Sequence, residues 1–327
     1  MAKYVNINGS NIPIRSSDPS NPQLGEIWYN TTSNSLKGQA FSTVGSFSTA
    51  PNLSNTHKSS GASGTSSSAA LVFGHEAGGP PSRLSESYDG TSWTATNPMT
   101  QDGDYANGFG TQTSAVAAGD GGPTGANSNT LWDGTCWTNS NPTSTYSYAR
   151  VGLGTGTSLG ALYGGTPTGG PQPRVENWNG TSWTAGTAMG SGSNNMGAAG
   201  LVPNAALLFG GDSPVVGVTQ LWNGSSWSTV NSLNYNRGNG AGSGVSTNAL
   251  YAGGGPGNNA NTETWDGTCW AANPGVLSIA RNSVPNTMTS ATNSSTLVAG
   301  GNGPPGGNAV EEWSGPGQAA TVTISSS

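Results

Sequence analysis

The residues that could carry chemistry in this sequence are few. Its 327 residues include 15 Asp and Glu, 9 Lys and Arg, 2 His and 2 Cys. A metal site needs several such ligands to converge, yet His57 and His75 stand in different predicted strands or loops. We therefore expect two loop or surface histidines, and neither a metal nor a cofactor.

The carboxylates give no pattern typical of a hydrolase. A glycosidase normally uses a pair of Asp or Glu residues at a set separation. The predicted loops contain Asp102, Asp104, Asp120 and Asp212, but no acidic pair recurs along the chain. An enzyme acting on surface polysaccharide is therefore the least favoured interpretation.

Three arginines recur at corresponding places in the sequence. Arg150, Arg237 and Arg281 could meet on one face and bind a ligand. The alternative is that each pairs with a nearby carboxylate, and Glu176, Glu263 and Glu311 recur as candidates. We favour the ion pairs over the ligand contact.

The composition limits the class of protein. The formal charge is −6 and only 7% of residues are charged, which argues against a nucleic-acid surface. No apolar run approaches the ~20 residues of a membrane helix, and the N-terminus lacks a signal-peptide core. Gly and Pro are abundant, but 11 Trp argue against disorder. A polar, turn-dense, all-β protein remains.

A repeat organises most of the chain. Six segments align on aromatic residues at 88, 132, 178, 222, 265 and 313, with spacings of 44, 46, 44, 43 and 48 residues. A period in the forties with β-strand signals is typical of propeller blades. Each unit predicts a small-residue inner strand, an apolar strand ending in glycine, and a hairpin carrying two aromatics.

The hairpin turns contain Asp-Gly or Asn-Gly, which is a strong hairpin signal. If Asp133-Gly134 forms a two-residue turn, Trp132 pairs with Thr135. Trp137 would then be its diagonal neighbour on the same face.

The last unit ends at Trp313-Ser-Gly without a second Trp. Phe47, in Gly45-Ser-Phe-Ser-Thr-Ala, matches the missing position, so we expect this segment to form the outer strand of the last blade. The sequence then predicts a six-bladed propeller over 41–315, with no long helix. Residues 1–40 would be an attachment segment, and 316–327 a further strand or tail.

Cys136 and Cys269 occupy the same place in units two and five. Three blades of six apart, they lie beyond the Cα separation of ~4.4–6.8 Å that a disulfide needs. We expect two free thiols that replace Ser.

The unit resembles the kelch repeat, in its Gly-Gly after the second strand, its Glu-x-aromatic before the turn, and its Trp after the turn. The resemblance implies a kelch-type propeller, and Arg150, Arg237 and Arg281 match the repeat's arginine. Kelch propellers include copper-dependent galactose oxidases, but two separated histidines do not match such a site. The Asp-Gly-x-x-Trp turns resemble the Asp boxes of sialidases, with one residue too few.

The arrays of Trp-Asn-Gly-Thr-Ser-Trp are similar to those in predicted proteins of marine bacteriophages. Gly25-Glu-Ile-Trp-Tyr-Asn-Thr-Thr32, followed by Leu36-Lys37, resembles short modules of phage tail-fibre proteins. An isolated hairpin is marginal in water. We therefore expect Ile27, Trp28 and Tyr29 to be buried against another copy or another virion protein, unless the segment is a strand added to the propeller rim.

These features predict a non-enzymatic phage virion protein, a fibre or tail component that displays a propeller for recognition of a host glycan or protein. The alternative is a capsid or tail decoration protein without a receptor role. Alternate connections of an antiparallel blade lie at the same face, so any ligand should bind where the long loops gather. That face should carry Tyr105, Tyr148 and Tyr235 as well as the three arginines, and Tyr and Arg often anchor interfaces.

Overall fold

The computed structural model describes residues 12–20, 22–23, 25–41, 44–76, 82–119, 127–167, 169–200, 204–285, 293–304, 307–316 and 319–324. The chain divides into two compact units. One comprises Met1–Gly45 with Gly315–Ser327, and the other comprises Ser46–Ser314. The described residues contain β-strands and no α-helix, and so no helix among them could cross a membrane.

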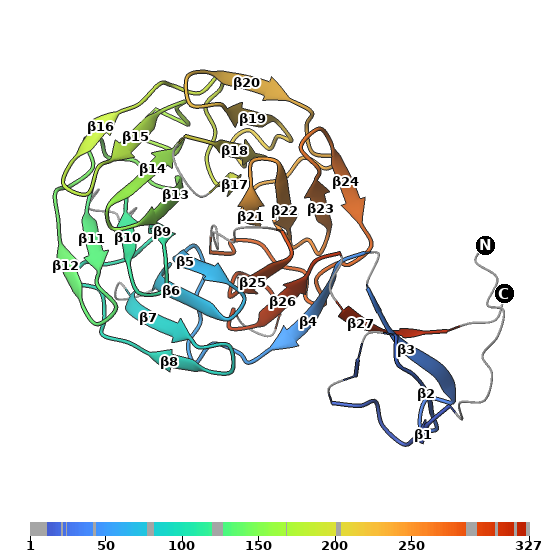
Figure 1. The fold of residues 1–327 in the computed structure, drawn as a ribbon. Helices are drawn as coiled ribbons and strands as arrows, with labels where there is room; N and C mark the ends of the chain where they lie inside the picture. Colours follow the sequence, from blue (N-terminus) through green and yellow to red (C-terminus); the bar gives the residue numbers. More distant parts are fainter. Residues whose placement is uncertain are drawn as a thin grey trace. The chain divides into compact units, whose positions relative to one another are not determined.

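The larger unit is a β-propeller whose sheets surround a common centre (Figure 1). Five of its sheets have four strands each, here called blades 1 to 5. Blade 1 contains β5 (Gly61–Ser66), β6 (Ala69–His75), β7 (Ser82–Tyr88) and β8 (Trp93–Ala95). Blade 2 contains β9 (Asn107–Gly110), β10 (Ala115–Ala118), β11 (Asn129–Trp132) and β12 (Trp137–Asn139).

The next three blades repeat this antiparallel order from the inner strand outward. Blade 3 contains β13 (Val151–Gly156), β14 (Leu159–Tyr163), β15 (Val175–Trp178) and β16 (Trp183–Ala185). Blade 4 contains β17 (Gly197–Ala199), β18 (Ala206–Phe209), β19 (Thr219–Trp222) and β20 (Trp227–Val230). Blade 5 contains β21 (Ala241–Val245), β22 (Asn248–Ala252), β23 (Thr262–Trp265) and β24 (Trp270–Asn273).

The last sheet of this unit joins the two ends of the repeat region. It consists of β25 (Ser295–Ala299), β26 (Val310–Ser314) and β4 (Ser46–Ala50), in that order. In the β26–β4 register Trp313 lies opposite Phe47, and their ring centroids are 4.9 Å apart. The pairing expected for Phe47 is therefore present.

The hairpin turns are longer than the sequence predicts. Trp132 lies directly opposite Trp137, not diagonal to it, and four residues separate them. The reason is the Asp133 side chain, whose Oδ1 accepts hydrogen bonds from the backbone N–H groups of Thr135 and Cys136, both at 2.8 Å. This Asx turn leaves only Gly134 with a positive φ.

Aromatic rings connect successive blades. A ring from each of blades 1 to 4 packs on the second Trp of the following blade. These pairs are Phe73–Trp137, Phe109–Trp183, Tyr163–Trp227 and Phe209–Trp270, with centroids 4.7–6.2 Å apart. Neighbouring glycines make the room, because a Cβ on Gly160 would lie 2.1 Å from the Phe109 ring. The Gly-rich sequence thus permits an aromatic core between sheets.

The smaller unit is one sheet, with strand order β1 (Ile14–Arg15), β2 (Ile27–Asn30), β3 (Ser35–Phe41) and β27 (Ala319–Thr323). β27 pairs antiparallel with β3. The C-terminal segment, expected to be a further strand or tail, therefore forms a strand that extends the sheet of the N-terminal segment. Cross-strand hydrogen bonding between the two chain ends gives this small unit four strands in place of a lone hairpin.

Candidate functional site

The long connections of the propeller gather on one face. In each four-stranded blade the short turns between strands one and two and between strands three and four lie at one end of the strands. The loops between strands two and three, and the connections to the next blade, lie at the other end, here called the long-loop face. Parts of the loops 75–83, 120–129, 166–174 and 302–308 fall outside the described residues.

A ring of left-handed residues surrounds the axis at this face. Ser59, Tyr105, Ala149, Asn195, Asn239 and Ser283 have φ values of 48–60°, and the first five each precede the inner strand of a blade. Backbone bonds join neighbours, such as Asn195 N–H to Ala149 O at 2.9 Å and Asn239 N–H to Asn195 O at 2.8 Å. They enclose a cavity of about 20 Å³, which suits one water.

Two of the three predicted tyrosines lie together. The rings of Tyr105 and Tyr148 have centroids 6.0 Å apart, and Tyr146, which the sequence analysis did not single out, lies 6.3 Å from Tyr148. Burial, a hydrogen bond to Glu76 and nearby negative charges raise the pKa of Tyr105 to about 12. Tyr235 lies before β21 and is 48% exposed. The face thus presents a half-buried tyrosine cluster and a separate exposed tyrosine.

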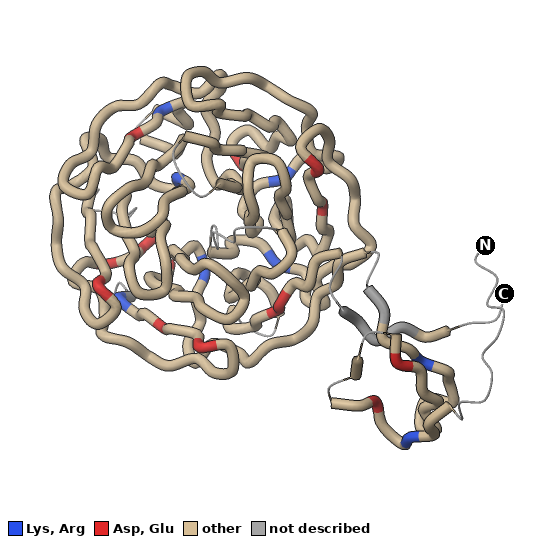
Figure 2. Tube along the Cα trace, viewed as in Figure 1, with Lys and Arg blue, Asp and Glu red and all other residues tan. Residues whose placement is uncertain are grey.

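The three arginines do not reach a ligand surface. Arg150, Arg237 and Arg281 are 0–1% exposed. They form ion pairs with Glu176, Glu263 (3.0 Å) and Glu311 (2.7 Å), respectively. The ligand-contact hypothesis for these arginines is wrong, and the favoured alternative of ion pairs is confirmed. Figure 2 shows how few other positions of the propeller carry charge.

The arginines are also not all equivalent. Arg237 and Arg281 lie two residues before the ring residues Asn239 and Ser283, whereas Arg150 follows Ala149. In blade 1 the position of Arg237 is taken by His57, which is completely buried and lies 3.3 Å from Glu86. His57 lies in the loop between β4 and β5, as one of the two expected alternatives had it, but it is not a surface residue. Its Nδ1 also lies 2.7 Å from the carbonyl of Gly74.

The glutamates organise the connections between blades. Each carboxylate accepts a hydrogen bond from a backbone N–H of the incoming connection, at Ser54, Ser144, Asn234 and Ser278 (2.7–2.8 Å). In blade 4 the neutral Gln220 takes this place and bonds to Ser191, and in blade 2 the residue is Thr130. At the position of Arg237, blade 4 has Ser193 and blade 2 has Gly103. Charge is therefore buried where a partner exists.

Acid should destabilise the propeller through these carboxylates. Burial alone would raise the pKa of Glu86, but hydrogen bonds from His57, Ser54 and Asn55 outweigh it and lower the pKa to about 2. Its pKa in the unfolded chain is ~4.3. Glu86 therefore stabilises the fold above pH ~5, and this contribution is lost as the pH falls towards 2.

Denaturant unfolding between pH 7 and pH 2 measures this loss. In Glu86→Gln the decrease in the free energy of unfolding between pH 5 and pH 2 should be smaller than in the wild type. Glu312→Gln, at a partly exposed position on β26, should leave the decrease unchanged. If the free energy of unfolding of Glu86→Gln decreased as much as that of the wild type, Glu86 would not be a source of the acid sensitivity.

The predicted attachment residues have different environments. Trp28 is fully buried within its own unit and donates from Nε1 to Asp18 at 2.9 Å. Asn30 and Lys37 bind the same carboxylate at 2.7 and 2.8 Å, and these hydrogen bonds, that from Lys37 first, lower the pKa of Asp18 to about 2. Trp28 is thus a core residue, and burial by a partner is a wrong prediction for it. Ile27 is half-buried, and Tyr29 is 36% exposed.

The remaining chemical candidates stay separate. Asp102 pairs with Arg83 at 2.7 Å on the surface, and no group of three His, Cys, Asp or Glu residues within the described ranges could hold a metal. Cys136 and Cys269 are exposed free thiols, as expected. Each lies near the carboxylate of its own turn, where Ser92 stands in blade 1.

Comparisons with known proteins identify the fold alone. No family model matches the sequence, and no curated protein resembles it. A solved structure described as that of YjhT superposes with a TM-score of 0.63 at 13% sequence identity, covering 85% of this chain and 97% of that chain. The similarity is that of a β-propeller.

Proposed function

We propose that this chain is a non-enzymatic structural protein of a bacteriophage particle, a fibre or tail component. It would display a six-bladed, kelch-type propeller for host-surface recognition. The repeat's resemblance to phage arrays and the N-terminal module support the virion location. The Glu-x-aromatic and Gly-Gly positions support the kelch type.

Contacts across the chain ends support six blades and their closure by β4. The β25–β26–β4 sheet neighbours blade 1, because Ser295 Oγ donates to Ser67 Oγ at 2.7 Å and Gly301 N–H donates to His57 O at 2.7 Å. Leu297, Ala299 and Val310 share a buried cluster with Val72 and Tyr88. These contacts support the proposal that this sheet is the sixth blade.

Attachment to the particle would use the smaller unit. Its sheet has a face opposite Trp28 on which Tyr29 lies in register with Ile14, and Ile14 is 74% exposed. Ile27 and Ile324 flank Gly38 on the same face. These apolar side chains suit burial against another virion protein or a second copy of the chain.

The observation that carries the recognition role is the tyrosine cluster on the long-loop face. Tyr105, Tyr146 and Tyr148 present rings and hydroxyls from two successive interblade connections. Such residues combine apolar area with a hydrogen-bonding group, which suits a glycan or a protein surface. The outer, variable loops of the same face would supply specificity.

Particles carrying Tyr148→Ala and Tyr235→Ala together should adsorb to host cells at least about tenfold more slowly, because both changes remove interface anchors. Thr135→Ala with Thr268→Ala, on exposed turns of the opposite face, is the matched control. Normal adsorption of the tyrosine variant, with an intact fold and normal incorporation, would favour a decoration protein without a receptor role.

A further inference from the structure

A cavity of about 260 Å³ lies between blades 3 and 4, away from the axial ring. Its walls include Tyr163, Asn177 and Thr187 of blade 3 and its outgoing connection. From the other side come Asn204, Trp222 and Trp227. The described lining residues carry no formal charge. Two indole rings and several neutral hydrogen-bonding groups thus surround one space.

The sequence explains why this interface is open. At three other interfaces an Asn four residues after the second Trp donates from Nδ2 to a carbonyl in the next blade's hairpin turn. These bonds are Asn97 to Thr135, Asn141 to Thr181 and Asn231 to Thr268, at 2.7–2.9 Å. In blade 3 the corresponding residue is Thr187, and the facing turn residue is Ser225. A threonine has no amide to make this bridge.

The tryptophans of blade 4 are correspondingly less covered. Trp222 and Trp227 are partly exposed, whereas both aromatics of the hairpins in blades 1, 2, 3 and 5 are buried. Trp132, Trp178 and Trp265 each donate from Nε1 to a carbonyl in the loop preceding the second strand of their own blade, at 2.8–3.1 Å. Trp313 donates in the same way to the carbonyl of Asn293, before β25, at 2.6 Å. In blade 4 the residue at the corresponding place, 203, lies outside the described residues.

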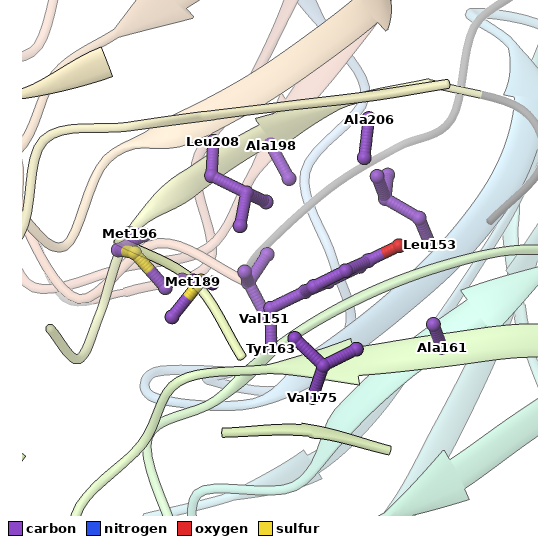
Figure 3. Close-up of a cluster of buried hydrophobic side chains, with 10 residues drawn as sticks. All are labelled: Val151, Leu153, Ala161, Tyr163, Val175, Met189, Met196, Ala198, Ala206 and Leu208. Atoms are coloured by element: carbon purple, nitrogen blue, oxygen red, sulfur yellow. The ribbon is translucent and has the colours of Figure 1, made fainter. Parts of the chain in front are cut away.

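Tyr163, which lines this cavity, also carries a buried hydroxyl. Phenylalanine stands at this register position in blades 1 and 4, as Phe73 and Phe209. The Tyr163 side chain is 1% exposed, and its hydroxyl has no hydrogen-bond partner among the described residues. Figure 3 shows the ring crossing the apolar cluster between Val175 and Leu153. A buried hydroxyl without a partner costs free energy, and a polar molecule that reached it would recover this free energy.

We propose that this cavity binds one neutral sugar residue. A pyranose has apolar C–H faces that can stack on Trp222 and Trp227, and hydroxyls that can bond to the amides of Asn177 and Asn204. The volume lies just below the ~300 Å³ at which pockets for larger organic ligands begin. The absence of formal charge among the described lining residues favours neutral over acidic sugars. The site does not depend on the tyrosine cluster or on the particle.

Ligand-observed NMR on the purified full chain tests the proposal. The probes are the methyl pyranosides of glucose, galactose, mannose and N-acetylglucosamine, with methyl glucuronide as the acidic comparison. We expect saturable binding of at least one neutral probe, with a dissociation constant near the millimolar range, as befits a single small ring. No saturable binding of any neutral probe would overturn the proposal.

Thr187→Asn provides the decisive variant because it restores the chain's own interblade bridge. The new amide should reach the Ser225 carbonyl, fill part of the cavity, and weaken binding at least about tenfold while the melting temperature is kept. Thr94→Asn, on the exposed edge strand β8, is the matched control and should bind normally. Tyr163→Phe should fold, as Phe73 and Phe209 do, and should weaken binding. Wild-type affinity in both Thr187→Asn and Tyr163→Phe would place the sugar elsewhere.

Discussion

Replacing Glu263 by Gln in blade 5 should lower the free energy of unfolding by about 3–5 kcal/mol, because it leaves the buried Arg237 without its counter-charge. Arg237→Met should have a comparable effect through the unpaired Glu263. In the double variant, Arg237→Met with Glu263→Gln, the free energy of unfolding should decrease less than in either single variant, since no uncompensated charge remains. It should still fall below the wild type, because Arg237 also donates to Tyr251 O at 3.0 Å and lies over the Tyr251 ring.

Blade 4 offers the reciprocal control. Gln220 holds the place of Glu263 there, and Ser193 stands where blade 5 has Arg237. Gln220→Glu would bury a carboxylate without a cation and should destabilise the fold to a similar extent. Denaturant unfolding at pH 7 measures all four variants. If the two single losses simply add in the double variant, the Arg237–Glu263 pair is not an energetic unit.

The spacing of the aromatic anchors was sufficient to predict the propeller and the partner of Phe47. In a repeat the same local structure occurs several times, so that a residue missing from one unit can be identified by comparison with the others. The hairpin turns were predicted less well. Asp133-Gly134 fits a two-residue turn by its backbone preference, but the Asp133 carboxylate bonds to two backbone N–H groups and holds four residues in the loop. A side chain that competes with the turn type changes the register of the two tryptophans.

The candidate site shows a similar limit. The ion pairs of Arg237 and Arg281 could be predicted from recurrence, but Arg150 reaches Glu176 from a different position. His57 could have been found, since it precedes the inner strand of blade 1 at the place of Arg237 and its unit carries Glu86. The cavity between blades 3 and 4 depends on a missing side chain at Thr187, and an absent contact leaves no motif in a sequence.

Trp28 was identified as important, but its role was not. An apolar run on a short hairpin predicts that something must cover it, and does not say what. Asp18 lies ten residues earlier in a Pro-rich stretch, and its carboxylate accepts hydrogen bonds from Trp28, Asn30 and Lys37. β27 is contributed from the other end of the chain. Local sequence patterns predict such pairings between distant segments of the chain less well than any other part of a fold.

Joining β4 to β26 by a disulfide should stabilise the propeller strongly in oxidising conditions. Ser48 lies opposite Glu312 in the register, and directly opposed antiparallel residues have Cα atoms about 4.5 or 5.5 Å apart, within disulfide reach. Ser48→Cys with Glu312→Cys would close a loop of about 260 residues, and the chain-entropy relation then gives on the order of 5 kcal/mol. Cys136→Ser and Cys269→Ser remove the exposed thiols, as Ser92 does naturally in blade 1.

The melting temperature of this variant, measured with and without reductant, separates the cross-link from the substitutions. The oxidised form should melt well above the reduced form, and the reduced form should stay near the Cys136→Ser, Cys269→Ser parent. The rise in melting temperature on oxidation requires that β4 and β26 are paired in the folded protein and separate when the protein unfolds. A second pair, Ser48→Cys with Ser314→Cys, is two positions out of register and should cross-link poorly. Equal cross-linking of both pairs, or no rise in melting temperature, would show that β4 does not hold this register in solution.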